Sequence, residues 1–361
     1  MGTLMADEAE LLTLARTGDE RAFNDLVEAH RAELRSYCYR MLGSVQDAED
    51  AVQNAMLRAW RGLGAFEGRS SVRTWLFKIA TNTTLDLARH RSRRELPADF
   101  GPPAAAGAAV EDAVLDAVWL EPYPDQWLAG VSGPGSDAGT AELAGPEARY
   151  ERRESVEIAF TVMLQHLPPL QRAVLILRDV LAFSAAEVAA QLSSTVAAVN
   201  SALQRARAAA QAGLPDSSQQ SVLRTLGDAR LASVAARYAD ALEAGDVNAL
   251  LAMLTADATW CMPPVPTWFQ GHEALRSWLT GGPLTHRWQH VTTRANGQLA
   301  VGCYLRSPAT GAYEPAIIDV LTLTRADGKI SAVTAFLLPD GQPGPASVFA
   351  RFGLPATAPA S

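Results

Sequence analysis

The chain has 361 residues, of which 48% are hydrophobic and 7% aromatic, and a formal net charge of −8. This length predicts two or three domains, and the composition excludes a disordered or fibrous chain. No apolar run of about 18 residues occurs and the first residues are acidic, so we expect a cytoplasmic protein with no membrane partner. The negative charge is unfavourable for DNA binding, but the arginines are concentrated in 58–94 and around 205–207.

The first 94 residues carry helical patterns. Residues 7–43 predict two helices, and Asp47 is expected to start the next one. One stripe of that third helix is apolar: Ala48, Ala51, Val52, Ala55, Met56, Ala59 and Leu63. The opposite face carries Asp50, Gln53, Asn54, Leu57 and Arg61. Leu57 is an apolar residue in the middle of a polar face, which indicates either a docking site for a partner or an isolated surface leucine.

A turn at Gly64–Gly68, followed by Ser70 as a candidate N-cap, predicts a helix over Val72–His90. This helix interleaves rings, cations and an amide: Arg73, Trp75, Phe77, Lys78, Asn82 and Arg89. Such a mixture is typical of single-stranded DNA binding, because rings stack on bases and cations follow phosphates. The alternative is that Trp75 and Phe77 are core residues.

Residues 95–149 read as a linker. Alanine, glycine and proline dominate 97–109, and 129–146 is rich in glycine, proline and serine. Between these stretches lies the aromatic and acidic sequence WLEPYPD, at 119–125. A free linker would not need Trp119, Tyr123 and Trp127, so we expect it to dock, either on a partner or on the chain's own domains.

Residues 150–213 return to a helical pattern, with helices expected at 156–167, 170–180, 185–192 and 196–210. Ser184 and Glu187 have capping-box spacing, and a short turn at Ser193–Thr195 predicts a helix-turn-helix. In its second helix Val196, Val199, Leu203, Ala206 and Ala210 are expected to face inward. The outward face carries Ala197, Ser201, Gln204 and Arg205, with Asn200 and Arg207 at its margins.

The tail, 223–353, differs from the helical segments before it, because it carries both helix and strand patterns. Helices are expected at 223–243, 247–254 and 271–279, and strands at 258–262, 288–294, 298–305, 316–324 and 330–338, with a hairpin turn at Asp327–Gly328. This pattern resembles the cone-shaped nuclear-transport-factor-2-like fold, which implies a pocket, and bulky and acid–base side chains are available to line it: Trp260, Met262, Trp268, His272, Trp288 and Asp319. No nucleophile motif occurs, so no catalytic residue is assigned, although an Asp/His pair in an apolar cone would suit proton abstraction. Cys38, Cys261 and Cys303 lie far apart, without a CxxC pair, and predict no metal site, no disulfide framework and no cofactor.

Two stretches of the first segment, DAEDAVQNAMLRAWR and RTWLFKIATNTTLD, resemble region 2 of the sigma-70 family in its extracytoplasmic-function group. The resemblance implies that the first helix docks on core RNA polymerase and that the second recognises and melts the −10 promoter element. It implies these polymerase-binding residues: Asp50, Gln53, Asn54, Leu57 and Arg61. The −10 residues would be Arg73, Trp75, Lys78, Asn82 and Arg89.

The helix-turn-helix segment is similar to sigma region 4, which reads the −35 element. The implied −35 residues are Asn200, Ser201, Gln204, Arg205 and Arg207. WLEPYPD resembles a linker stretch of sigma factors with C-terminal extensions, and the tail resembles the nuclear-transport-factor-2-like cones of the polyketide-cyclase-like branch.

The resulting prediction is a multidomain protein: two all-α domains, a region 2 bundle at 7–94 and a region 4 helix-turn-helix at 150–213, plus an α+β cone at 223–353. The expected function is a non-enzymatic sigma factor that initiates transcription and is modulated by the cone, with core RNA polymerase and promoter DNA as partners. A small-molecule ligand and an anti-sigma protein are further candidate partners. Two alternatives stay open, namely a DNA-binding regulator with a sensor cone and an enzyme acting through the cone.

Overall fold

The computed structural model describes residues 2–114, 119–128, 156–214, 217–338 and 344–358. The chain divides into two compact units. The helical unit contains Met1–Arg93, Trp127–Glu154 and Met163–Leu214, and the cone unit contains Arg94–Gln126, Ser155–Val162 and Pro215–Ser361. Most of the described linker therefore belongs with the cone, which agrees with the expectation that it docks on the chain's own domains.

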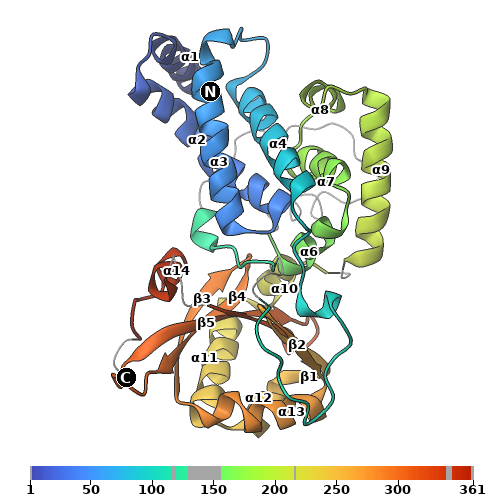
Figure 1. The fold of residues 1–361 in the computed structure, drawn as a ribbon, viewed down its shortest axis with the longest axis vertical. Coiled ribbons are helices and arrows are strands. Elements are labelled where there is room, and N and C mark those ends of the chain that lie inside the picture. The colour runs from blue at the N-terminus through green and yellow to red at the C-terminus, as the bar shows by residue number, and fades with distance from the viewer. Residues whose placement is uncertain (1, 115–118, 129–155, 215–216, 339–343, 359–361) are drawn as a thin grey trace. The chain divides into compact units, whose positions relative to one another are not determined.

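The helical unit begins with α1 (Gly2–Arg16), α2 (Glu20–Leu42), α3 (Val45–Gly62) and α4 (Val72–His90) (Figure 1). The apolar stripe of α3 is buried as predicted, apart from the half-buried Met56. The predicted helix starts were wrong by a few residues. Ser44, not Asp47, caps α3, because its hydroxyl accepts a hydrogen bond from the Asp47 N–H at 3.0 Å. Ser71, not Ser70, caps α4 through the Thr74 N–H at 3.1 Å.

The next helix, α6 (Ile158–His166), starts in the cone unit and enters the helical unit at Met163. The helical unit continues with α7 (Pro169–Leu175), a π-helical turn (Ile176–Val180), α8 (Ala185–Gln191) and α9 (Val196–Gly213). The capping box is present, since Ser184 and Glu187 exchange hydrogen bonds at 3.2 and 2.7 Å. Val199, Leu203, Ala206 and Ala210 face inward as predicted. Val196 does not, since 44% of it is exposed at the first turn of α9.

The cone unit contains α10 (Gln219–Leu226), α11 (Asp228–Ala244), α12 (Val247–Met253), α13 (His272–Gly281) and α14 (Pro345–Arg351) (Figure 1). Its strands are β1 (Leu254–Met262), β2 (Val265–Gln270), β3 (Trp288–Ala295), β4 (Gln298–Arg306), β5 (Tyr313–Leu323) and β6 (Ile330–Leu337). They form one sheet in the order β2-β1-β6-β5-β4-β3, antiparallel except for the β1–β6 pair. The predicted hairpin turn at Asp327–Gly328 joins β5 and β6, with Gly328 at φ 67°.

Two elements of the cone differ from the prediction. The single helix expected over 223–243 is split at Gly227, whose φ of 73° ends α10 before α11 begins. Strand β2 was not predicted, because prolines at 263, 264 and 266 are typical of a loop. Pro266 is tolerated because β2 is an edge strand of the sheet.

Alternating side chains separate two apolar clusters on the two faces of the sheet. On β5, Leu321 and Leu323 join the cluster beneath α11 and α13, which we call the inner cluster. Ile318 and Val320 join the cluster beneath α14, which we call the outer cluster. Asp319 shares the parity of Leu321, and its strand neighbours Val301 and Ala335 belong to the same first cluster. The carboxyl group of Asp319 therefore enters the cone's inner apolar cluster.

Candidate polymerase, DNA and cone sites

The polar face of α3 is open. Leu57 is 49% exposed, and its four predicted companions are exposed as well: Asp50, Gln53, Asn54 and Arg61. The buried alanines on the other side of α3 hold the helix in the bundle through close packing with α2 and α4. An apolar side chain surrounded by amides and charges has the composition of a protein-binding surface.

Exposed polar residues also follow one side of α4. Lys78, Asn82, Asp86 and Arg89 are exposed and recur at helical spacing. Arg89 donates a hydrogen bond to the Asp86 carboxylate at 3.1 Å. Because Lys78 is exposed, a backbone phosphate could approach its ammonium group.

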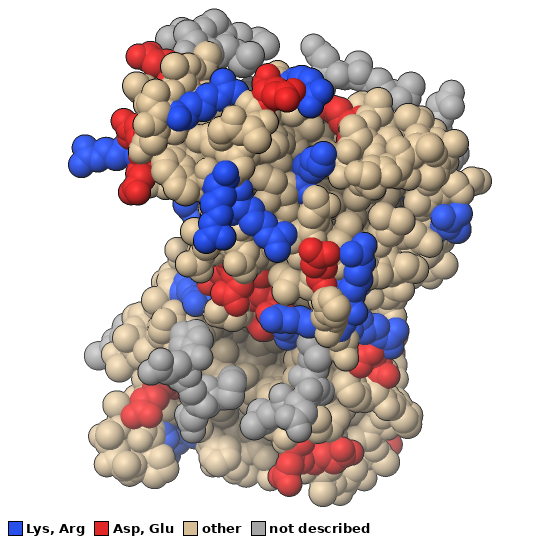
Figure 2. Space-filling model, turned by 45° about the horizontal axis from the view of Figure 1, so that its top comes forward, with Lys and Arg blue, Asp and Glu red and all other residues tan. Residues whose placement is uncertain are grey.

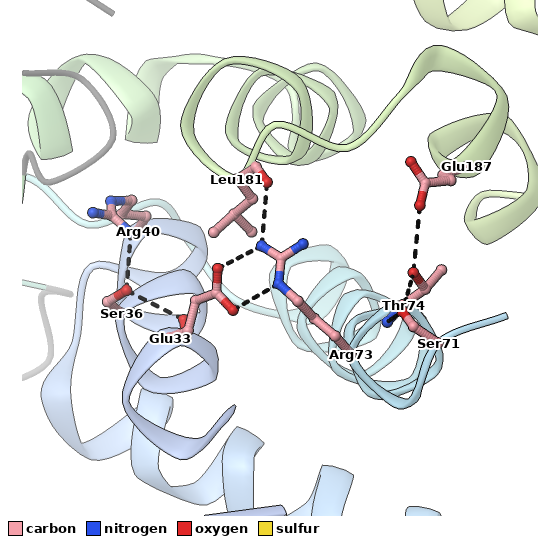
Figure 3. Close-up of polar contacts among 8 residues, drawn as sticks. All are labelled: Glu33, Ser36, Arg40, Ser71, Arg73, Thr74, Leu181 and Glu187. Atoms are coloured by element: carbon pink, nitrogen blue, oxygen red, sulfur yellow. Dashed lines mark hydrogen bonds and ion pairs between the residues drawn. The ribbon is translucent and has the colours of Figure 1, made fainter. Parts of the chain in front are cut away.

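The two remaining −10 candidates lie in contacts within the protein. The Trp75 ring is half-buried and stacks on Phe66, with centroids 4.7 Å apart and an interplanar angle of 30°. Arg73 donates two hydrogen bonds to the Glu33 carboxylate, at 2.9 and 2.5 Å (Figure 3). Glu33 on α2 was missed at the sequence level, because a pair 40 residues apart leaves no periodic signal.

On α9 the predicted reading face is exposed at Asn200, Ser201, Gln204 and Arg205. Arg205 donates a hydrogen bond to the Ser201 hydroxyl at 2.7 Å, an arrangement confined to the helix surface. Arg207 differs, because it forms a two-bond ion pair with Asp179 at 2.8 and 2.6 Å. This pair raises the pKa of Arg207 and ties α9 to the π-helical turn before α8.

Figure 2 shows Lys and Arg side chains interspersed with Asp and Glu side chains on one face of the protein. No single continuous basic surface is visible in this view. With a formal net charge of −8, the protein gains little nonspecific DNA affinity by itself.

Inside the cone, a buried polar group lies among apolar residues. The Tyr238 hydroxyl and the Cys303 thiol both donate to Oδ2 of Asp319, at 2.8 and 3.3 Å. Burial raises the pKa of Asp319 to about 6, and the two hydrogen bonds oppose that rise. Burial also raises the pKa of Tyr238 and of Cys303, so both keep their protons and act as donors.

The predicted pocket residues fall into different surroundings. Trp260, Met262 and Trp288 pack in the inner cluster, where Trp260 meets Trp278 edge to face at 5.3 Å. Trp268 is outside this cluster, because its neighbour Phe269 takes the inward position on β2, and its indole N–H donates to the Gly101 carbonyl at 2.9 Å. His272, at the start of α13, has a buried Nε2 atom without a hydrogen-bond partner among the described residues.

The linker binds one edge of the cone sheet. Next to β2, the N–H of Ala104 donates to the Trp268 carbonyl at 2.8 Å, and the N–H of Val114 donates to the Pro264 carbonyl at 3.0 Å. Glu111 adds a hydrogen bond from its N–H to the Thr267 hydroxyl at 2.9 Å. These bonds cover part of an edge strand that would otherwise present unpaired backbone groups.

The linker also binds the turn between β3 and β4. Asn296 and Gly297 form this turn with φ 56° and 67°. The Asn296 N–H donates to the Tyr123 carbonyl at 2.8 Å, and the Tyr123 N–H donates back to the Asn296 side chain at 2.9 Å. The Gly297 N–H donates to Asp125 at 2.7 Å. The Asn-Gly pair signals a tight turn, but nothing in the sequence showed that the linker binds it.

Within the described ranges, no three His, Cys, Asp or Glu side chains gather as a metal site would require, and no helix is long and apolar enough to cross a bilayer.

Three family models match successive parts of the chain: Sigma-70 region 2 over residues 26–94, Sigma-70 region 4 over 158–209 and a SnoaL-like domain over 235–333. The exposed face of α3, the cationic side of α4 and the helix-turn-helix thus fall within domains that define a class of transcription initiation factors. The chain is 39% identical to "ECF RNA polymerase sigma factor SigG" of Mycobacterium tuberculosis, over 94% of this chain and 85% of the relative.

The chain belongs to the ECF RNA polymerase sigma factors, the promoter-recognising subunits of RNA polymerase, and carries a fused SnoaL-like domain. It is also 28% identical to "ECF RNA polymerase sigma factor SigJ" of the same species, over 87% of this chain and 91% of the relative. The crystal structure of that SigJ matches the fold with a TM-score of 0.52 at 22% identity, and covers 91% of this chain and 99% of the SigJ chain. The predicted multidomain fold, with two helical domains and a cone, is confirmed.

Proposed function

We propose that the cone modulates transcription by this sigma factor through the linker. The observation that carries the proposal is the binding of one linker to two places on the cone sheet, the β2 edge and the β3–β4 turn. The linker connects regions 2 and 4, so the cone constrains the segment that sets how far those regions can separate.

Apolar packing of the linker on the cone adds to these hydrogen bonds. Tyr123 and Leu120 are almost fully buried. Leu120 packs in the outer apolar cluster of the cone together with Ile158, the first residue of α6. Leu120 and Ile158 therefore both contribute to the apolar core of the cone. On the other side of Gln126, the guanidinium of Arg35 on α2 lies 4.4 Å from the centroid of the Trp127 ring. Trp127 is the next residue in the chain, so movement of the linker on the cone would be transmitted along the backbone to it.

The contact residues are part of the same proposal. Core polymerase would bind the exposed α3 face of Asp50, Gln53, Asn54, Leu57 and Arg61. The −10 element would bind Lys78, Asn82, Arg89, Trp75 and Arg73, and the −35 element would bind Asn200, Ser201, Gln204 and Arg205. We expect Arg207 to support α9 through Asp179 and not to read bases. The protein would work in the cytoplasm, where core polymerase is.

The cone would act without catalysis. Asp319 is the buried carboxyl group best suited to act as a base, but two internal donors already occupy one of its oxygens. A small-molecule ligand of the cone would instead change how the sheet holds the linker. An anti-sigma protein remains a candidate for the same regulatory step.

The test is run-off transcription with core polymerase and the full chain carrying Asn296→Gly. Glycine tolerates the positive φ but removes the side chain that binds Tyr123 and donates to the Val156 carbonyl at 2.8 Å. A coupling of about 1–3 kcal/mol would change activity about 5- to 150-fold, upward if the docked linker restrains the helical regions and downward if it aligns them. Ala326→Gly, in the exposed β5–β6 turn, is the matched control for an added glycine. Equal activity of Asn296→Gly, control and parent would reject the linker route.

A further inference from the structure

The last described segment, 344–358, lies across the outer face of the cone sheet. Its helix, α14, packs on β5 (Figure 1). Phe349 of α14 is fully buried, and Phe352 and Leu354 after the helix are each 4% exposed. All three belong to the outer cluster, whereas α11 and α13 cover the inner cluster on the other face. The segment therefore covers one face of the sheet, and the inner cluster on the opposite face is packed without it.

A glycine in β4 makes room for this segment. A Cβ atom added at Gly302 would lie 2.5 Å from Cδ1 of Leu354 and 3.2 Å from the Phe349 ring. The φ of Gly302 is not positive, so the backbone does not require glycine there, but the close approach of Leu354 does. Further along the same face of β4, the Tyr304 ring meets Phe349 edge to face, with centroids 4.9 Å apart. Gly302 and Tyr304 thus form a notch that fits Leu354 and Phe349.

Hydrogen bonds from two strands hold the backbone of the same segment. The Tyr304 hydroxyl on β4 donates to the Pro355 carbonyl at 2.9 Å. The Thr293 hydroxyl on β3 donates to the Phe352 carbonyl at 2.6 Å. Both carbonyls follow the end of α14, where helical hydrogen bonding stops. The sheet therefore binds the segment through its backbone as well as through its apolar side chains.

The linker lies next to the segment at the end of β3. Two residues after Thr293, Ala295 forms a β-bridge with Pro124 of the linker. The Gln126 side chain lies against the backbone of Gly353, where an added Cβ atom would collide with the Gln126 amide group. The φ of Gly353 is 70°, a second reason for glycine at this position. The segment and the linker thus contact each other as well as the same sheet.

The outer cluster also joins the segment to the linker. Leu120 of the linker is 1% exposed, and it shares this cluster with the three apolar side chains of the segment. Departure of the segment would leave Leu120 with fewer apolar partners and would remove the backbone against which Gln126 lies. The position of the linker on the cone therefore depends on the segment.

We propose that segment 344–358 is a strap that holds the linker on the cone. Seated in the notch of Gly302, the strap completes the cluster that buries Leu120, and its release frees the linker while the inner cluster stays folded. The linker route of the proposed function then has its own control element, and the effect of the strap on transcription rests on that function. Holding of the linker does not depend on transcription and can be measured directly.

The experiment is hydrogen-exchange mass spectrometry of the full chain carrying Gly302→Val. Valine suits a strand but fills the notch, so the strap should leave its place. We expect the backbone amides of 119–126 and 344–358 to exchange about tenfold faster than in the parent, with those of α11 and α13 unchanged. Gly281→Val is the matched control, because a Cβ atom at the exposed Gly281 meets no other described residue within 4 Å. This control should exchange like the parent.

Leu354→Asp in the full chain releases the strap in a second way, because a carboxylate is costly to bury among apolar side chains. A separate peptide of the parent sequence 344–361 should occupy the vacated notch and slow the exchange of the linker again. Parent-like exchange of 119–126 in both variants overturns the strap, whether or not 344–358 is released. Faster exchange of α11 and α13 in both variants also overturns it, because the segment would then be needed for the cone to fold.

Run-off transcription separates the strap from the proposed function. A freed linker with the parent's transcription contradicts control through the linker and leaves the strap standing. Changed transcription by Asn296→Gly, together with a linker that stays protected when the strap is released, contradicts the strap alone.

Discussion

At the scale of single residues, Leu57 gives the sharpest test of polymerase docking. Leu57→Asp places a charge in the centre of an exposed face, and should weaken core binding by about 2–4 kcal/mol, as central interface residues do. Folding should be unaffected, since the side chain is half exposed. A titration with core polymerase measures the affinity, and circular dichroism checks helicity. Leu14→Asp, at a comparably exposed leucine of α1, is the control. Parent-like affinity of Leu57→Asp would remove this residue from the interface.

Asp125 predicts a pH dependence of linker docking. Burial raises its pKa from 3.8 to about 6, against the Gly297 hydrogen bond and Arg294. The native state therefore binds the proton more tightly than the unfolded state, so this group lowers the free energy of unfolding as pH rises from about 4 to 6. Asp125→Asn keeps an acceptor without a charge, and should stabilise the cone by about 1–3 kcal/mol above pH 6 and by little at pH 4.

Urea unfolding followed by tryptophan fluorescence at several pH values measures this difference. Asp327→Asn is a control of opposite sign, because hydrogen bonds from Thr324 and Lys329 lower the pKa of Asp327. Its carboxylate stabilises the fold above its unfolded pKa, so the amide should give no gain at neutral pH. A pH-independent effect of Asp125→Asn would show that its carboxyl group does not titrate in this range.

At the scale of elements, we expect residues of α4 to contribute to opening of the promoter strands. Lys78→Ala should reduce promoter melting more than duplex binding, because the exposed side chain would approach the phosphates of the opened strand. Trp75→Ala should do the same by about 1–3 kcal/mol if its ring leaves Phe66 to stack on an extruded base. Permanganate footprinting reports the open strands. Lys329→Ala, at an exposed lysine of the cone, is the matched control. If Trp75→Ala melts the promoter like the parent, the Trp75 ring has only a structural role, in its packing with Phe66.

On α9, Gln204 and Arg205 are expected to read bases, whereas Arg207 is expected to support the structure of region 4. Gln204→Ala and Arg205→Ala should relax discrimination at one or two positions of the −35 element, each by about 1–3 kcal/mol. Arg207→Ala should instead lower the thermal stability of region 4, because it leaves Asp179, which is almost buried, without its partner. Binding to duplexes with single substitutions distinguishes these effects. An equal loss of affinity on every duplex would place Gln204 and Arg205 on phosphates.

Periodic elements could be predicted from the sequence, and contacts between distant elements could not. The apolar stripe of α3, the capping box of Ser184 and the Asp327–Gly328 turn are local patterns, and each is present in the structure. Prolines concealed β2, and Gly227 divided a helix whose apolar pattern runs through the break. The exposed positions of the α3 and α9 faces followed from helical spacing. The pairing of Arg73 with Glu33 did not, because it depends on how three segments pack.

At the scale of the whole molecule, the division into two units means that removal of the tail would also expose part of the linker. The linker residue Leu120 and Ile158 of α6 pack in the cone's apolar cluster, so a chain ending after Pro215 would lose their partners. These two side chains are 1% and 6% exposed in the full chain. The truncated chain would therefore carry an unshielded apolar linker that the cone no longer holds.

We expect this truncation to change run-off transcription about 5- to 150-fold relative to the full chain, since a coupling of about 1–3 kcal/mol is lost. Either direction supports control, because the docked linker can hold the regions closed or aligned. Adding the separate tail, residues 216–361, should restore part of the parent's activity if it rebinds the linker through Asn296 and the β2 edge. A tail carrying Asn296→Gly should restore less. If the truncated chain transcribes like the parent while the isolated tail converts a small carbonyl substrate, the cone is an enzyme and its control of transcription is refuted.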